Sequence, residues 1–146
     1  PQPHQIDLAW HHSGSLTFNQ YVQSADAFEK KGYAHLTNIR ACDDLQWQAT
    51  WENLNTAMWA SNPEGTTTYI CNAPGNPASD TLSLILRRVK GNQAIFVSLI
   101  EPFADYSAIA SVQWTQENTT LRVSIEGDSL SDTWHIDHQN DIYKQV

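Results

Sequence analysis

The sequence predicts an all-β protein, an antiparallel β-sandwich of about nine short strands, and three observations support this prediction. Apolar and polar residues alternate with a period of two along most of the chain. Glycine, proline and asparagine separate the alternating segments at short intervals. Helical patterning is confined to residues 24–32, SADAFEKKG, which could form a helical turn or a loop. Because a doubly wound fold needs helices between its strands, packed antiparallel sheets fit the pattern better.

Length and composition predict one domain over residues 1–146. The hydrophobic fraction of 40% and the six tryptophans are sufficient for a single buried core. Neither an internal repeat nor a low-complexity tract divides the chain. The proline-rich stretches 61–66 and 72–80 have the composition of turns rather than of linkers.

The clearest alternation lies in residues 45–52, LQWQATWE. Trp47 and Trp51 share one face with apolar neighbours, and glutamines occupy the other face. We therefore expect both tryptophans to be buried against a second sheet. Residues 53–55 then predict a turn into a strand over 56–61.

The second half of the chain shows the same kind of pattern. Residues 90–92, Lys-Gly-Asn, predict a hairpin between strands over 81–89 and 93–101. The other expected strands cover residues 5–11, 15–20, 66–71, 107–114, 120–126 and 131–137.

The charge distribution excludes some classes of partner. The net charge is −8 and no basic run is present, so a nucleic-acid or anionic-membrane surface is not expected. No segment approaches the roughly 20 apolar residues of a membrane-spanning helix. Residues 1–5 lack the pattern of a signal peptide, so we expect the chain to begin after processing or partway through a longer protein.

Histidine and cysteine positions give little support for a metal site. His11 and His12 are candidate metal ligands, but neighbours on a strand point to opposite faces and cannot both bind one ion without a bulge. Leu8 and Trp10 share a face with His12, which predicts packing or hydrogen bonding for that histidine. Cys42 and Cys71 are expected to be free thiols.

Tryptophan and arginine provide candidate ligand contacts. Exposed tryptophan rings stack on sugars, and Trp47, Trp51 and Trp59 are close in sequence. Trp59 is the candidate for a sugar contact, because Trp47 and Trp51 are expected on the buried face. Arg87 and Arg88 face opposite ways on a strand, so one of them could meet the carboxylate of a ligand or an adjoining domain. The simpler expectation is that both border a sheet and bury only their stems.

Four stretches in a fixed order resemble a known family: HQIDLAWHHSGSL, the Gly-Tyr-x-His-Leu pattern of residues 32–36, LQWQATWEN, and LRRVKGNQAIFVSLIEPF. The series resembles the C-terminal β-sandwich of the heparinase II/III superfamily, most of all its alginate and oligoalginate lyases. The resemblance spans residues 4 to 138, nearly the whole chain. It implies a parent polysaccharide lyase, secreted or periplasmic, in which an α-helical toroid precedes a larger multi-strand sandwich.

The resemblance also implies where the chemistry lies. Such lyases cleave uronic-acid polymers by β-elimination, with catalytic Asn, His and Tyr residues in the toroid and the early sandwich. The metal site of some members also lies in that earlier part, so no cofactor is expected here. Tyr33 and His35 match a family motif and are the candidate catalytic residues, although the motif is expected mainly to lock a loop. The alternative is an independent carbohydrate-binding sandwich with exposed tryptophans.

Overall fold

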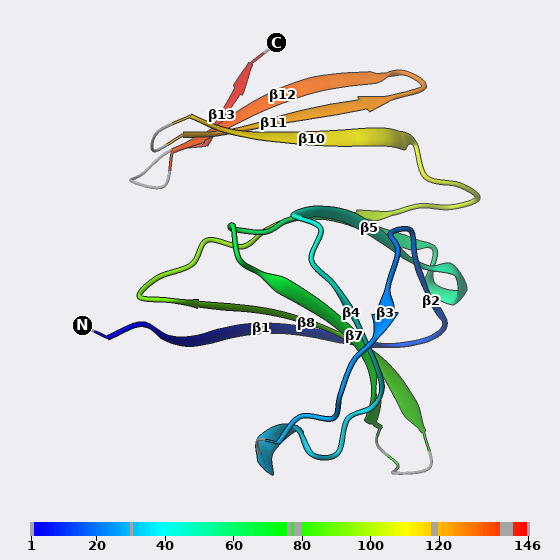
Figure 1. Cartoon of the computed structure of the whole chain (residues 1–146). Coiled ribbons are helices and arrows are strands. Elements are labelled where there is room, and N and C mark those ends of the chain that lie inside the picture. The colour runs from blue at the N-terminus through cyan, green and yellow to red at the C-terminus, as the bar shows by residue number, and fades with distance from the viewer. Residues whose placement is uncertain are drawn as a thin grey trace.

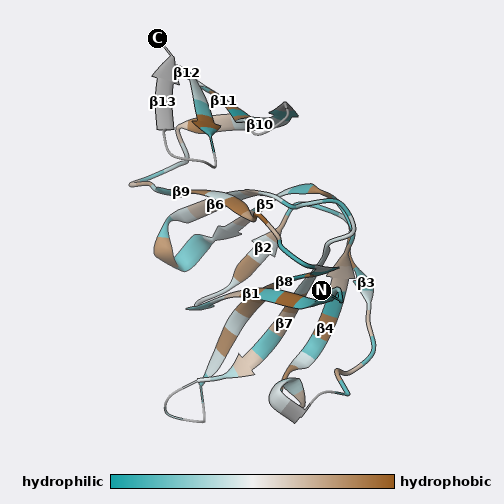
Figure 2. Cartoon of the chain, turned by 90° about the vertical axis from the view of Figure 1, so that its left-hand side faces the viewer, coloured by the Kyte–Doolittle hydropathy of each residue, from teal (hydrophilic) through white to brown (hydrophobic). Residues whose placement is uncertain are grey.

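The computed structural model describes residues 2–29, 31–75, 77, 80–117, 120–137 and 142–145, and it forms three stacked antiparallel sheets (Figures 1 and 2). Sheet A contains β1 (His4–Ser13), β8 (Thr81–Gly91), β7 (Thr67–Pro74), β4 (Thr37–Cys42) and β3 (Gln23–Ser24), in this spatial order. Sheet B contains β2 (Leu16–Phe18), β5 (Gln46–Trp51), β6 (Thr56–Ser61) and β9 (Val97–Pro102). Sheet C contains β10 (Ile109–Glu117), β11 (Thr120–Gly127), β12 (Leu130–Asp137) and β13 (Ile142–Gln145).

The predicted all-β class is confirmed, because the described residues contain no α-helix. Their only helical pieces are the 3₁₀ turns η1 (Lys31–Tyr33) and η2 (Glu52–Leu54). The described part of the chain contains 13 strands, more than expected, because β3, β4 and β13 were not predicted. No helix among the described residues is long and apolar enough to cross a membrane.

Sheet B is the middle layer, and its strands bury side chains on both faces. Trp47 and Trp51 pack toward sheet A in a cluster that includes Ile85 of β8, as their alternation predicted. Ala57 and Trp59 of β6 pack on the opposite side, against sheet C. A third layer was not predicted, because single-strand alternation shows which residues are buried but not what buries them.

The predicted hairpin between residues 81–89 and 93–101 is wrong. Strand β8 lies between β1 and β7 in sheet A, whereas β9 pairs with β6 in sheet B. Leu84, Ile85 and Leu86 of β8 are all buried, so this strand is covered on both faces. A continuous apolar run is typical of such a central strand, and this long-range pairing outweighs the local turn signal.

Residues 25–29 and 31–36 cover the outer face of sheet A and form no α-helix (Figure 1). The segment follows β3 as an irregular chain and then makes the single 3₁₀ turn η1. Its side chains Phe28, Tyr33 and Leu36 pack against Leu84 and Leu86 of β8. The outer face of sheet A is therefore partly buried under this segment, which also borders the groove described below.

Candidate functional site

Arg87 and Arg88 are neighbours on β8 and lie on opposite faces of sheet A, as the period of a strand requires. Arg87 points between sheets A and B, where its side chain has no exposed surface. Arg88 points to the outer face, where it retains 18% of its side-chain exposure. The two arginines therefore occupy separate sites with different chemistry.

Neutral groups surround Arg87. Its Nε donates to Oδ1 of Asn62 at 2.6 Å and its Nη1 to the hydroxyl of Ser98 at 2.8 Å. Its Nη2 donates to the carbonyl oxygens of Ser61 and Val97 at 2.5 and 3.2 Å. Burial lowers the pKa of Arg87 to about 10, which leaves the guanidinium charged at neutral pH. No carboxylate among the described residues pairs with it, so this arginine joins sheet A to sheet B through hydrogen bonds alone.

Arg87 thus contradicts the expectation that both arginines bury only their stems. Its whole side chain lies inside the protein, and the ring of Phe96 is 4.8 Å from its guanidinium carbon. A ligand carboxylate has no access to this group. The role that the geometry supports is cohesion between two sheets.

Arg88 forms the centre of a polar cluster on the outer face of sheet A. Its Nε and Nη2 donate to the two carboxylate oxygens of Asp7 at 2.8 and 3.1 Å. The Tyr33 hydroxyl donates to the same carboxylate at 2.6 Å, and the Gln5 amide donates to it at 2.8 Å. Strands β1 and β8 and turn η1 are joined in this way. The Tyr33 contact is a loop-locking one, of the kind expected for the motif.

The pKa shifts follow from this cluster. Partial burial opposes ionisation of Asp7, but the hydrogen bonds from Arg88, Tyr33 and Gln5 outweigh it and hold the pKa of this carboxyl below its usual value. The hydrogen bond to Asp7 raises the pKa of Tyr33. Partial burial also opposes the charge of Arg88, but Asp7 outweighs it and raises the pKa of the guanidinium. The cluster therefore holds a stable ion pair and a protonated phenol at neutral pH.

Three aromatic rings enclose Arg88. Its guanidinium carbon lies 4.7 Å from the centre of the Phe28 ring, 5.1 Å from that of Tyr33 and 5.5 Å from that of Tyr69. Cation–π contacts of this kind stabilise a partly desolvated arginine. Arg88 is thus fixed in position by an acid on one side and aromatic faces on the others.

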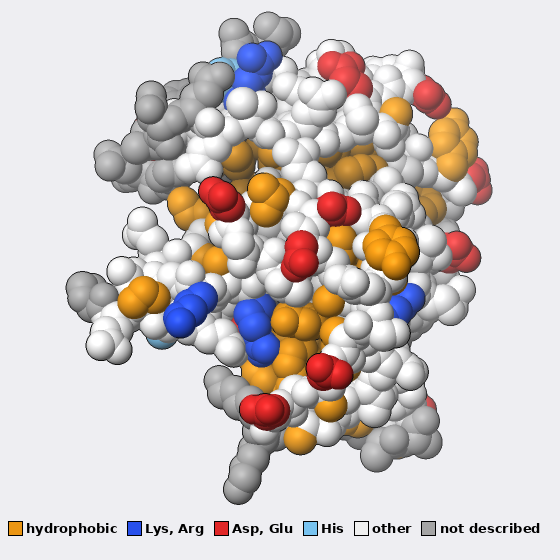
Figure 3. Space-filling view, in the orientation of Figure 1, with side chains coloured by type: hydrophobic (Ala, Val, Ile, Leu, Met, Phe, Trp, Pro, Cys, Tyr) orange, Lys and Arg blue, Asp and Glu red, His pale blue; other side chains and the backbone are white. Residues whose placement is uncertain are grey.

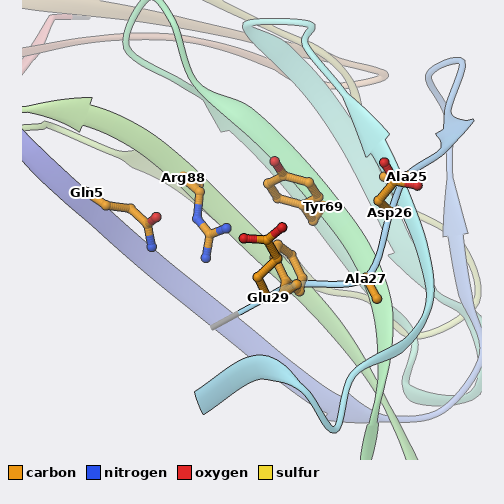
Figure 4. A pocket seen from close by; sticks show the side chains of 8 residues that line it. Gln5, Ala25, Asp26, Ala27, Glu29, Tyr69 and Arg88 are labelled. Atoms are coloured by element: carbon orange, nitrogen blue, oxygen red, sulfur yellow. The ribbon is translucent and has the colours of Figure 1, made fainter. Parts of the chain in front are cut away.

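A groove of about 760 Å³ opens beside Arg88, between sheet A and residues 25–29 (Figure 4). Figure 4 shows the Glu29 carboxylate pointing toward the Arg88 guanidinium, with Tyr69 on the side toward Ala25 and Asp26. A second hollow of about 410 Å³ shares part of this lining and extends the groove toward Lys90. Figure 3 shows this face of the molecule, with hydrophobic and basic side chains side by side over the strands of sheet A and acidic side chains around them. The groove is lined by Gln5, Ala25, Asp26, Ala27, Phe28, Glu29, Tyr69 and Arg88.

The open margin is a second feature, and the name covers two edge strands, β1 of sheet A and β9 of sheet B. Each of these strands pairs on one side only within the described chain. Trp10 pairs with Ile85, Ile100 pairs with Met58, and the two partners belong to one buried cluster. Trp10 and Ile100 nevertheless remain 39% and 43% exposed. Each of the two edge strands thus carries a partly exposed apolar side chain next to a residue of the core between sheets A and B.

The remaining candidate residues do not converge on either feature. Trp59 is buried between sheets B and C, so its ring faces are not accessible to a sugar. His35 is exposed and lies outside the Arg88 cluster, although Tyr33 belongs to it. His11 and His12 are exposed. The ring of His12 lies 6.0 Å from that of Trp51 between centroids, and its Nδ1 lies within hydrogen-bond distance, 3.1 Å, of the Ser13 carbonyl oxygen, in keeping with the expected packing or hydrogen bonding.

The described residues give little support for a metal site or a reactive thiol. Within the described ranges, no three His, Cys, Asp or Glu side chains are grouped so that they could hold a metal ion. Cys42 and Cys71 are buried, free thiols. Burial raises the pKa of Cys71 to about 11, which keeps it protonated and unreactive.

A scan of the sequence against models of known protein families finds no match, and a search of curated protein sequences finds no relative. Sequence reasoning had identified Arg88 and Tyr33 but missed Phe28, Glu29 and Tyr69. Phe28 and Glu29 lie in the segment 24–32 that was assigned to a turn or loop. The only signal was the single aromatic residue in that polar stretch, which is too weak to reveal a groove.

Proposed function

We propose that this chain is the C-terminal sandwich region of a polysaccharide lyase that cleaves uronate polymers, alginate-like ones in particular, by β-elimination. The ordered resemblance supports this class, and an all-β sandwich is the fold that the resemblance implies. In such a reaction the substrate carboxylate is neutralised, a base removes the proton at C5, and an acid protonates the departing glycosidic oxygen. We assign these steps, and any metal ion, to the helical toroid and early sandwich of the parent enzyme, which is secreted or periplasmic.

The role proposed for the chain itself is to brace the toroid and complete one wall of its cleft. The observation that carries this role is the open margin, where Trp10 and Ile100 lie exposed on strands that pair on one side only within the described chain. Exposed apolar residues beside free strand edges are favourable sites for another part of a protein to pack.

The two arginines support a bracing role rather than a catalytic one. Arg87 is fully buried and Arg88 is already paired with Asp7, so each of them stabilises the sandwich. A substrate carboxylate would have to displace Asp7 from Arg88, and it would then leave a partly buried acid without its partner.

The test compares the 146-residue chain with the longer polypeptide that contains this chain, isolated from the natural source. We expect the chain alone to produce no unsaturated product from alginate, and the longer protein to produce it. In the longer protein, replacing Trp10 by serine should lower the melting temperature more than it does in the isolated chain, where this ring is exposed. Turnover by the isolated chain would contradict the proposal.

The alternative, a carbohydrate-binding module with a tryptophan platform, is less well supported. Trp47 and Trp51 each retain only 3% exposure, and Trp59 is buried as well. Of the six tryptophans, Trp10 alone is strongly exposed, and it lies at the open margin. A single ring does not form the row of stacked faces that this alternative requires.

A further inference from the structure

We propose that the groove beside Arg88 binds a neutral saccharide, with a sugar ring against Tyr69 and Phe28 and its hydroxyls between Arg88 and the carboxylates of Asp26 and Glu29. This site is separate from the uronate chemistry proposed above and does not depend on it. Its volume of about 760 Å³ lies within the range of roughly 300–1,000 Å³ that small-molecule sites occupy.

The groove offers both hydrogen-bond donors and acceptors, as a polyhydroxylated ligand requires. Nη1 of Arg88 is not used in the ion pair with Asp7, which involves Nε and Nη2. Figure 4 shows the Glu29 carboxylate facing this guanidinium. A hydroxyl group both donates and accepts, so it can bridge a guanidinium and a carboxylate that do not bond each other directly.

The aromatic lining gives the ligand an apolar surface to cover. Tyr69 and Phe28 are half-buried, and their rings lie edge to face at 4.9 Å between centroids. This arrangement fixes the two rings on a strand and on the adjoining segment, so little conformational freedom is lost when a ligand packs there. The C–H face of a pyranose is the kind of apolar surface that aromatic rings attract.

Charge selects a neutral ligand over an acidic one. Asp26 and Glu29 contribute two negative charges to the lining, and the positive charge of Arg88 is already balanced by Asp7. A uronate would therefore meet net repulsion, which the chain's overall charge of −8 reinforces.

The test is a titration of the ¹⁵N-labelled chain followed by amide chemical shifts. The neutral probes are cellotetraose, mannotetraose and xylotetraose, and the acidic probe is tetramannuronate. We expect at least one neutral probe to shift the amides of residues 25–29 and 67–69, with a dissociation constant in roughly the millimolar range. Tetramannuronate should bind these residues at least tenfold more weakly.

Two variants connect the binding to the groove. Glu29→Ala lies on the exposed segment and should weaken the neutral probe at least fivefold, whereas Asp105→Ala, an exposed acid outside the lining, should leave it unchanged. Tyr69→Leu keeps an apolar side chain in β7 but removes the ring, and should weaken binding to a similar extent.

Three outcomes would overturn the proposal: no response to any neutral probe, equal or tighter binding of tetramannuronate in the groove, or shifts confined to the open margin. None of these bears on whether the natural protein is a lyase, so the two proposals can fail separately.

Discussion

The two faces of sheet A hold adjacent arginines through different kinds of partner. The inner face holds Arg87 without a carboxylate, satisfied by an amide, a hydroxyl and two carbonyl oxygens from sheet B and its flanking residues. The outer face holds Arg88 through Asp7 and three aromatic rings, and leaves part of it open to a groove. The inner arginine connects two layers, so its removal should affect the whole fold. The outer one connects neighbouring segments of the surface, so its removal should be local.

Removal of the inner arginine should have the largest effect. In Arg87→Ala, the buried acceptors of Asn62 and of the Ser61 and Val97 carbonyls lose their donor, which should cost about 3 kcal/mol or more of unfolding free energy. Urea denaturation of the two proteins measures the difference. The control is Arg122→Ala, an exposed arginine of sheet C, for which we expect less than about 0.5 kcal/mol. Equal effects of the two substitutions would show that the buried network does not hold the layers together.

Removal of the outer acid should have a smaller, pH-dependent effect. Asp7→Asn should cost about 1–2 kcal/mol near neutral pH, because the ion pair with Arg88 and two charge-assisted hydrogen bonds are lost or weakened. The folded state holds the pKa of Asp7 below its unfolded value. Its stabilising contribution is therefore present above the unfolded pKa and disappears as the pH falls through the folded pKa.

The difference between Asp7→Asn and the native chain should accordingly stay constant from about pH 7 down to about pH 4 and shrink as the pH falls further. Denaturation curves recorded across this range test the sign directly, with Asp128→Asn, an exposed acid in the turn between β11 and β12, as the control. A gap between the two proteins that does not change with pH would contradict the assignment of the ion pair.

The hydrogen bond from Tyr33 to Asp7 should contribute less to the unfolding free energy than the ion pair of Asp7 with Arg88. Tyr33→Phe removes one hydrogen bond to the Asp7 carboxylate and leaves the ring in place, so we expect a loss of about 1 kcal/mol. Hydrogen exchange should also quicken at residues 31–36, where the segment is fastened to β1. Tyr21→Phe is the matched control, because that tyrosine is 85% exposed. If both substitutions leave stability and exchange unchanged, Tyr33 does not lock the segment.

The smallest effect on stability is expected at the rim of the groove. Glu29→Ala should change the unfolding free energy by less than about 0.5 kcal/mol, since this side chain is exposed. Thermal denaturation measures it. A large loss would mean that Glu29 supports the fold, and it would separate this residue from the ligand-binding role proposed for it.

Local patterns predicted the part of the fold that depends on neighbours in sequence. The alternation of residues 45–52 correctly placed Trp47 and Trp51 inside, and the turn at residues 53–55 correctly joined two paired strands. Strand β4 was missed because its alternation is broken: Asn38 has a positive φ of 50°, and the pairing with β7 shifts register near it. A bulge of this kind removes the period of two on which the prediction depends.

The candidate site is formed by residues that are separated in the sequence, and local patterns do not predict contacts of this kind. Alternation correctly placed Arg87 and Arg88 on opposite faces, but Asn62 and Ser98 lie far from Arg87 along the chain, and Asp7 is 81 residues from Arg88. These residues come together because of the order of the strands in the sheets. The wrong hairpin prediction for β8 and β9 shows that turn signals in the sequence do not reveal this order. The groove needs in addition the irregular segment 25–29, whose conformation no periodicity describes.

The most direct test of the proposed function is to isolate the natural protein with an antibody against this chain, determine its intact mass, and assay it on alginate beside the 146-residue chain. The account predicts a longer polypeptide that releases unsaturated oligosaccharides, and no release by the chain alone. A natural product of only these 146 residues, or turnover by the isolated chain, would contradict it.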